Sequence, residues 1–230
     1  MAKKNTAGED RMVAVEEALG RTEQFIEKNQ NILMYVIIGV ILVVLGYFGY
    51  QRLYISPMES NAQEEIFMAQ KYFEMDSLYR ALNGDGNALG FLDIIDDYGS
   101  TKSGNLARYY AGICYLKMGN FEEAIDYLED HDPVDQIIGP MALGALGDAW
   151  LELNEPDKAV GYYMDAADEN NNDFTTPMFL YKAGMTYEIL GNYEEALEAY
   201  DRIFREYYRS AEGRTFERNI AKMKRLIEAE

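Results

Sequence analysis

Cys114 and His131 are the only cysteine and the only histidine of the chain, and they are the side chains best suited to act as a nucleophile and a base. A catalytic pair requires both groups to be held together and oriented by a third group. Cys114 lies between Ile113 and Tyr115 in a stretch expected to be helical, where it is better interpreted as a small packing residue. A single cysteine forms no internal disulfide or multi-cysteine metal site, and a single histidine forms no two-histidine metal site. The sequence therefore predicts that the protein is not an enzyme.

Sequence motifs for metals and cofactors are also missing. Carboxylates gather between Asp126 and Asp135, but this segment lacks the ligand spacing and the central glycine of an EF-hand calcium loop. The chain contains neither a P-loop nor a dinucleotide-binding glycine fingerprint. We therefore expect no metal and no cofactor.

The chain is strongly acidic, and its charge is unevenly distributed. The formal net charge is −19, yet residues 1–52 sum to zero, with six basic and six acidic side chains. Residues 53–201 contain seven basic and 29 acidic side chains, a net charge of −22, whereas residues 202–230 contain eight basic and five acidic ones, a net charge of +3. Because 48% of the chain is hydrophobic, the acidic residues belong to folded surfaces rather than to a disordered tail. The strong negative charge of residues 53–201 argues against nucleic acid and anionic lipid headgroups as ligands of this part of the chain.

One segment near the N-terminus has the length and composition of a transmembrane helix. Asn29–Gln51 contains no charged residue, and Ile32–Tyr50 is apolar apart from its tyrosines. Nineteen helical residues at about 1.5 Å each reach about 28 Å, close to the thickness of the hydrocarbon core of a bilayer. The apolar run is longer than that of a signal peptide, and its N-terminal flank is long and acid-rich, so we expect an uncleaved anchor.

Basic residues on either side of the span predict its orientation. Arg11, Arg21 and Lys28 lie on the N-terminal side, whereas Arg52 stands alone near the other end. The positive-inside rule favours a cytoplasmic N-terminus in the inner membrane, which places everything after the span in the periplasm of a bacterium. Within segment 1–31, the pattern of apolar and charged residues predicts an amphipathic helix from about Arg11 to Lys28. This helix either lies on the membrane, meets a partner, or extends the spanning helix into solvent.

Three later segments, Tyr109–Leu128, Gly144–Tyr163 and Tyr181–Tyr200, share one pattern of small and aromatic residues. In each segment a glycine is followed three positions later by an aromatic residue, then by a turn, and then by an alanine, and the alanines recur at intervals of 35 and 37 residues. Glycine and alanine let two helices approach closely, and aromatic rings fill the space beside them. The matching positions are Gly112, Gly147 and Gly184, then Tyr115, Trp150 and Tyr187, then Ala124, Ala159 and Ala196.

This pattern resembles the tetratricopeptide repeat, a helix-turn-helix unit of 34 residues. The resemblance implies an all-α fold in which a single transmembrane helix is followed by a right-handed α-solenoid with a C-terminal capping helix. Gly119 and Gly191 supply the stops between the two helices of a repeat, whereas Asn154 stands at the corresponding turn without a glycine. Pro133 is expected to cut the second helix of its repeat short.

The ends of the solenoid are less regular in sequence. Helical patterns at 59–82 and 89–98 predict an atypical first repeat, in which Gly90 stands 34 residues before Ala124, at the position expected for the repeat alanine. An apolar stripe that begins at Phe216 predicts the capping helix. The expected domains are a cytoplasmic amphipathic segment (1–31), the transmembrane helix (32–50), the atypical first repeat (56–104), three tetratricopeptide repeats (105–139, 140–176 and 177–210) and the capping helix (211–230).

The resemblance also implies a binding surface, the concave groove lined by the first helix of each repeat. The expected groove is apolar and contains methionines, which adapt to many apolar shapes, and its carboxylates are expected to favour clients with basic residues. A clamp for a terminal carboxylate is not expected, because Lys117 is nearly the only basic residue in the set. The expected groove residues are Tyr109, Ile113, Leu116, Lys117, Met141, Asp148, Leu151, Glu152, Met178, Tyr181, Met185 and Glu188.

The order of the parts, together with the segment Phe25–Asn31 before the span, resembles the YfgM-type ancillary proteins of the bacterial Sec translocon. That resemblance implies a periplasmic, chaperone-like domain whose partners are exported polypeptides, the translocon or a membrane-anchored prolyl isomerase. The alternative is a structural scaffold that organises a cell-envelope assembly complex. A chaperone protects many unfolded clients weakly, whereas a scaffold binds one folded partner stoichiometrically.

Overall fold

The computed structural model describes the backbone of residues 6–210 and 216–229, and the side chains of residues 28–210 and 216–229. Within these ranges every regular element is a helix, as the sequence predicts. The chain divides into two compact units, residues 1–57 and residues 58–230. The side chains of the expected amphipathic segment up to residue 27, and the first five residues of the expected capping segment, lie outside the described residues.

The first unit is helical from Thr6, with α1 (Thr6–Tyr50) followed by a π-helical turn, η1 (Gln51–Ile55). In η1 the Ser56 N–H donates to the Gln51 carbonyl, five residues back rather than four. Pro57 supplies the reason, because it has no N–H to donate and its ring crowds the carbonyl four residues before it. Most large apolar side chains of the predicted span are exposed, with exposed fractions between 45 and 73%. This helix is long and apolar enough to cross a membrane.

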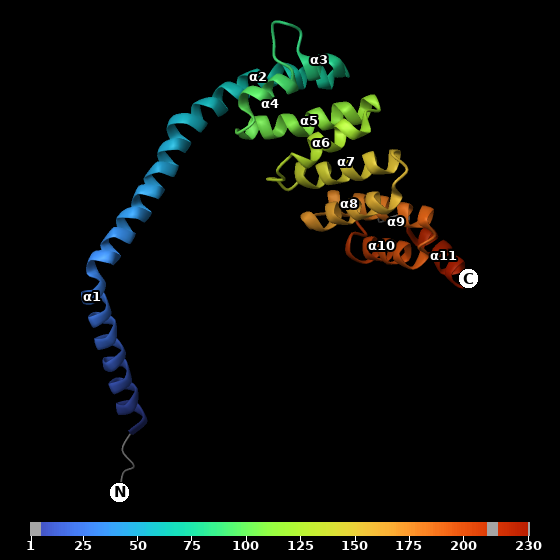
Figure 1. Ribbon diagram of the computed structural model, residues 1–230. Coiled ribbons are helices and arrows are strands. Elements are labelled where there is room, and N and C mark those ends of the chain that lie inside the picture. Colours follow the sequence, from blue (N-terminus) through green and yellow to red (C-terminus); the bar gives the residue numbers. More distant parts are fainter. Residues whose placement is uncertain (1–5, 211–215, 230) are drawn as a thin grey trace. The chain divides into compact units, whose positions relative to one another are not determined.

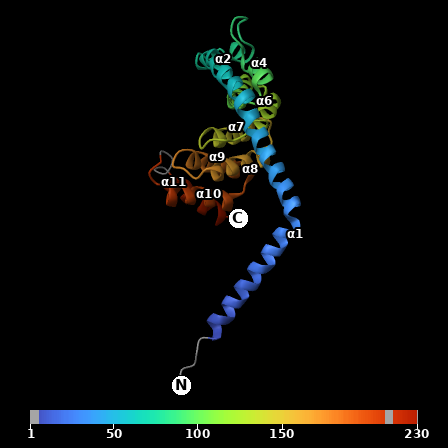
Figure 2. The ribbon, with the colours of Figure 1, turned by 90° about the vertical axis from the view of Figure 1, so that its left-hand side faces the viewer.

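The second unit is a stack of helix pairs (Figures 1 and 2). Each pair consists of a longer first helix and a second helix that packs antiparallel against it. The helices are α2 (Ser56–Glu74), α3 (Leu78–Asn83), α4 (Phe91–Tyr98), α5 (Lys102–Met118), α6 (Phe121–Glu129), α7 (Ile138–Glu152), α8 (Pro156–Glu169), α9 (Thr175–Leu190), α10 (Tyr193–Glu206) and α11 (Phe216–Ile227).

The first helix of every pair ends in the same hydrogen-bonded turn. At the end of α9, Gly191 has a left-handed backbone, its N–H donates to the Glu188 carbonyl, and the N–H of Asn192 donates to the Tyr187 carbonyl. This is a Schellman turn, which satisfies the last carbonyls of a helix and reverses the chain. Asn154 adopts the same conformation with a φ of 60°, so an asparagine replaces the glycine without loss of the turn.

The repeated glycines lie where the two helices of a pair are in closest contact. A Cβ atom at Gly147 would lie 2.6 Å from Cε1 of Tyr163 and 3.1 Å from the Ala159 carbonyl oxygen, so no larger residue fits without a shift. Gly112 faces Leu128 in the same way, and Gly184 faces Tyr200. The spacing of glycine and alanine in the sequence is therefore explained by helix packing, as predicted.

The first repeat is more regular than its sequence suggests, and two details of its prediction are wrong. The expected helix 59–82 is broken at Asp76, whose φ of 55° places it in the left-handed region and ends α2 with a Schellman turn. Counted from this turn, Ala81 occupies the position of the repeat alanine, and it is fully buried. Gly90 is not that position. It closes the inserted segment 84–90, where a Cβ atom would lie 2.1 Å from the Leu82 carbonyl oxygen and 2.4 Å from the Gly84 nitrogen, so there is no room for a side chain.

The inserted segment splits the second helix of the first repeat into α3 and α4 and projects from the stack (Figure 1). Asp85 holds it together: its carboxylate accepts hydrogen bonds from the Tyr72 hydroxyl at 2.7 Å and from the N–H groups of Asn87 at 2.9 Å and Ala88 at 2.8 Å. The hydrogen bond from Tyr72, followed by the two from the backbone, lowers the pKa of Asp85 to about 2.

The core of the stack is continuous from the first repeat to α11. One cluster of buried residues joins α2 to α5, a second joins α5 and α6 to α7, and a third joins α7 to α11. Phe216 and Met223 anchor α11 in the third cluster, with exposed fractions of 1% and 0%. The stack therefore ends on a helix whose apolar face is covered and whose other face is polar, as expected of a cap.

Candidate functional site

The predicted groove residues come from α5, α7 and α9, the first helices of three successive repeats, which lie next to one another in the stack. Three of them, Tyr109, Ile113 and Leu116, pack against the cluster that contains Ala142 and Ala149 of α7. Their side chains are half-buried and form the seam between two repeats. They are therefore partly used in packing between the repeats rather than projecting freely into solvent.

A similar seam joins α7, α9 and α11. Met141, Leu151, Met178 and Tyr181 are half-buried against the C-terminal core cluster. Tyr181 also contacts the Phe216 ring edge-on, with 5.4 Å between the ring centroids. Among the predicted groove residues, the exposed side chains are Lys117, Glu152 and Met185.

Two of the three carboxylates among the predicted groove residues, Asp148 and Glu188, are already paired within the chain. Asp148 accepts a hydrogen bond from the Tyr163 hydroxyl at 2.6 Å and forms an ion pair with Lys182 at 2.7 Å. Glu188 accepts a hydrogen bond from the Tyr200 hydroxyl at 2.7 Å and forms an ion pair with Lys222. These pairings reduce the negative charge of the predicted groove, so Glu152 carries most of the negative charge that is left to attract basic clients.

The two tyrosines are held as hydrogen-bond donors. Burial, together with the hydrogen bond to Asp148, raises the pKa of Tyr163 well above its usual range. Burial and the hydrogen bond to Glu188 raise the pKa of Tyr200 in the same way. Both hydroxyls therefore remain protonated at neutral pH and donate hydrogen bonds to their carboxylates.

The N-terminal end of the groove carries a different pair. Lys117 forms an ion pair with Asp76 at 2.8 Å and lies over the Phe73 ring, 5.2 Å from its centroid. This contact links α5 to the end of α2. Lys117, the one basic residue among the predicted groove side chains, is therefore already paired within the chain.

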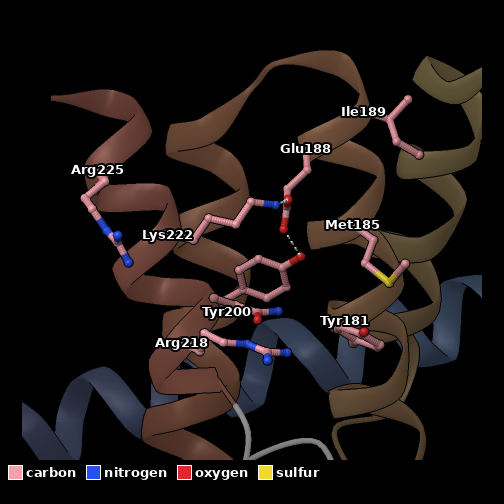
Figure 3. Close-up of a pocket in the computed structure, with 9 residues that line it drawn as sticks. Tyr181, Met185, Glu188, Ile189, Tyr200, Arg218, Lys222 and Arg225 are labelled. Carbon is pink, nitrogen blue, oxygen red and sulfur yellow. Dashed lines mark hydrogen bonds and ion pairs between the residues drawn. The ribbon is translucent and has the colours of Figure 1, made fainter. Parts of the chain in front are cut away.

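The C-terminal end of the groove is hollowed into a pocket of about 730 Å³ (Figure 3). Tyr181, Met185 and Glu188, all predicted groove residues, line it from α9. The opposite wall consists of Arg218, Asn219, Lys222 and Arg225 of α11, which the sequence reading assigned only to a cap. The net charge of +3 over residues 202–230 was the sequence signal that set this wall apart. The remaining lining residues are Ile189 and Tyr200.

Cys114 and His131 form no visible reactive site. Cys114 is fully buried in the N-terminal core cluster, and burial raises the pKa of its thiol to about 12. The His131 Nδ1 atom lies 3.0 Å from the Asn105 carbonyl oxygen and tethers the loop after α6, which ends at Glu129, before Pro133. Across the described residues there is no group of three or more His, Cys, Asp or Glu side chains that could hold a metal.

Paired helices stacked with their first helices side by side define an α-solenoid of helical repeats. Models of the tetratricopeptide repeat match residues 106–130 and residues 179–209. No curated protein sequence matches the chain. These two segments are therefore tetratricopeptide repeats, as the sequence pattern predicts, and the helical stack that contains them has the fold expected of such repeats.

Solved structures resemble the chain at low sequence identity. One consists of nearly identical TPR-like repeats from a Podosopora anserina protein assigned as a kinesin light chain; it is 12% identical, covers 74% of this chain and 88% of that chain, and has a TM-score of 0.55. Another is the MamA protein, which is 17% identical and has a TM-score of 0.47; the match covers 74% of this chain and 90% of that chain.

The tetratricopeptide repeat is a protein–protein interaction module and is typically a non-catalytic scaffold, so the partners of this chain are proteins.

Proposed function

We propose that the protein is a single-pass membrane protein whose repeat domain lies in the periplasm and binds exported polypeptides, as a chaperone-like or translocon-associated factor. The observation that carries the proposal is the helix at Ile32–Tyr50, which is uncharged and exposes its apolar side chains in front of a protein-interaction domain. A soluble protein rarely leaves such a face uncovered, whereas a bilayer covers all of it.

The groove supports weak and adaptable binding. Most of its apolar side chains are committed to seams between repeats, and Met185 and Ile189 of α9, 46% and 66% exposed, are the freest apolar contacts at its C-terminal end. Each such contact contributes on the order of 1 kcal/mol or less after ordering costs, so several are needed for binding at about micromolar affinity. Weak capture of many unfolded chains fits a chaperone-like role.

Topology is the first test. Protease added outside spheroplasts that express the full chain should degrade the repeat domain after about Arg52 and spare the N-terminal tail. Lysed spheroplasts serve as the control, since there the tail should be lost as well. Protection of the repeat domain in intact spheroplasts would reverse the orientation and remove the periplasmic assignment.

Client capture is the second test. The full chain in lipid nanodiscs should slow the aggregation of an unfolded secretory protein, and Met185→Asp with Ile189→Asp should abolish this effect, because charged side chains would replace the exposed apolar contacts. Phe174→Asp is the matched control, since Phe174 is 62% exposed but lies in the loop before α9, outside the pocket. Equal client capture by the double variant and the wild type would favour the scaffold alternative, with a folded partner docking elsewhere.

A further inference from the structure

The pocket at the C-terminal end of the groove has two chemically different walls (Figure 3). The α9 wall presents Met185 and Ile189, which are exposed and apolar. The α11 wall presents Arg218, Lys222 and Arg225, which recur at intervals of four and three residues and therefore lie on one face of the helix. An apolar strip thus faces a row of positive charges across a cavity of about 730 Å³.

The basic wall is held in place by an aromatic cluster beneath it. The Phe216 ring stacks on the Tyr200 ring, with 5.2 Å between centroids, and contacts the Tyr181 ring edge-on. Met223 is fully buried on the same side of α11. Because these contacts fix the rotation of α11 about its axis, the three basic side chains face the pocket before any ligand arrives, which lowers the ordering cost of binding.

The pocket lining contains three basic side chains but only one acidic side chain. Lys222 is paired with Glu188, the one acidic residue of the lining. Arg218 and Arg225 form no ion pair with any side chain in the described part of the chain, and the Arg225 Nε atom donates only to the Ala221 carbonyl of its own helix. Arginine side chains bind carboxylates through two parallel hydrogen bonds, so these two are free to receive acidic groups.

The charge of the remaining domain restricts where an acidic ligand can bind. Residues 53–201 carry a net charge of −22, so an acidic peptide is repelled from most of the stack. At physiological ionic strength this repulsion decays over about 8 Å, so that contacts with the arginines dominate once the peptide is in the pocket. A basic peptide experiences the opposite, with attraction along the stack and repulsion at the pocket.

We propose that this pocket docks an acidic segment of a protein partner, in which Asp or Glu side chains alternate with aliphatic or aromatic ones. The carboxylates bind Arg218 and Arg225, and the apolar side chains lie against Met185 and Ile189. This assignment deepens the proposed function, on which it rests: the groove captures clients, and its C-terminal end selects those with acidic rather than basic residues beside their apolar ones.

The test measures peptide binding to the full chain in lipid nanodiscs by fluorescence anisotropy, with empty nanodiscs as the blank. The probe is a labelled twelve-residue peptide that alternates Glu with Leu and Phe and is acetylated and amidated, so that no terminal carboxylate contributes. We expect binding at about micromolar affinity, and binding at least about tenfold weaker for the counterpart with Lys in place of Glu. Raising the salt concentration should weaken binding of the Glu peptide.

Charge variants locate the binding site. Arg218→Gln with Arg225→Gln should weaken binding of the Glu peptide about tenfold, and the Glu replacements of the same two residues should weaken it further. Lys224→Glu is the matched control, because Lys224 is exposed on α11 but does not line the pocket; it should leave the affinity within about twofold. Circular dichroism of each variant establishes that α11 remains helical.

Two results would overturn the inference: equal binding of the Lys and Glu peptides, or equal losses for Lys224→Glu and for the arginine pair. If the wild type captures an unfolded secretory protein but not the Glu peptide, the inference fails and the proposed function stands. If it captures neither, the proposed function fails as well.

Discussion

Replacing Gly147 by alanine tests the close contact between α7 and α8. The added Cβ would lie 2.6 and 2.7 Å from two carbons of the Tyr163 ring, whereas carbon atoms at their best separation are about 3.5 to 4.0 Å apart. The ring has little room to move, because Tyr163 is 1% exposed and its hydroxyl is bonded to Asp148 at 2.6 Å. The Ala159 carbonyl, at 3.1 Å, blocks the other side.

The expected magnitude combines two opposing effects. Overpacking in a core typically costs about 1 to 3 kcal/mol, and an overlap of about 1 Å against a fixed ring belongs near the upper end. Alanine favours a helix over glycine by about 1 kcal/mol. Gly147→Ala should therefore lower the free energy of unfolding by about 2 kcal/mol, which corresponds to a melting temperature about 4 to 8 °C lower for a domain of this size.

Gly161 provides the matched control. It lies within α8, is exposed, and a Cβ there would meet nothing within 4 Å. Gly161→Ala should therefore stabilise the domain by up to about 1 kcal/mol. Urea unfolding of residues 56–230, followed by circular dichroism and by the fluorescence of Trp150, the only tryptophan, measures both variants. If Gly147→Ala is as stable as the wild type, the two helices of this repeat do not approach as closely as we describe.

Two further predictions concern buried positions. Ala196→Leu should lower the free energy of unfolding by about 1 to 3 kcal/mol, because Ala196 is fully buried at the contact between α9 and α10. The control, Ala221→Leu on the exposed side of α11, should have little effect, and equal melting temperatures for the two variants would refute the prediction. Cys114 should react with a thiol reagent at pH 8 only after unfolding, because the thiol is buried and its pKa is raised from 9.0 to about 12. The contribution of this thiol to the free energy of unfolding should accordingly stay constant below pH 9 and fall as the pH rises from 9 towards 12. Rapid labelling of the folded protein would contradict the burial of this residue.

The repeated contacts could be predicted because each requires a residue type that few others can replace. A glycine that faces a ring, as Gly184 faces Tyr200, and a left-handed turn at Gly191 leave a pattern that recurs with the repeat length. The same pattern is present in the first repeat, where Ala69, Tyr72 and Ala81 keep the spacing. It was harder to see there, because an aspartate occupies the left-handed position and an insertion follows α3 within the second helix.

The details of the candidate site were less predictable. The pattern places Asp148 and Glu188 on the groove side of their helices, but it does not show that each carboxylate has a lysine partner on a neighbouring helix. The amphipathic stripe beginning at Phe216 predicts a cap, yet the polar face of that helix forms one wall of the pocket. Such contacts join side chains from different repeats, and their distances depend on how the repeats stack rather than on any local pattern.

The two tyrosine–carboxylate–lysine groups also bear on how the solenoid avoids misassembly. In both, the lysine follows its acid by 34 residues, which is one repeat length. The acids nevertheless stand at different heights on their helices, because Asp148 precedes its left-handed turn residue by six positions and Glu188 precedes its own by three. Repeats with similar apolar cores can exchange neighbours during folding, and ion pairs at unequal heights favour the native order of stacking over an order in which an acid does not face its lysine.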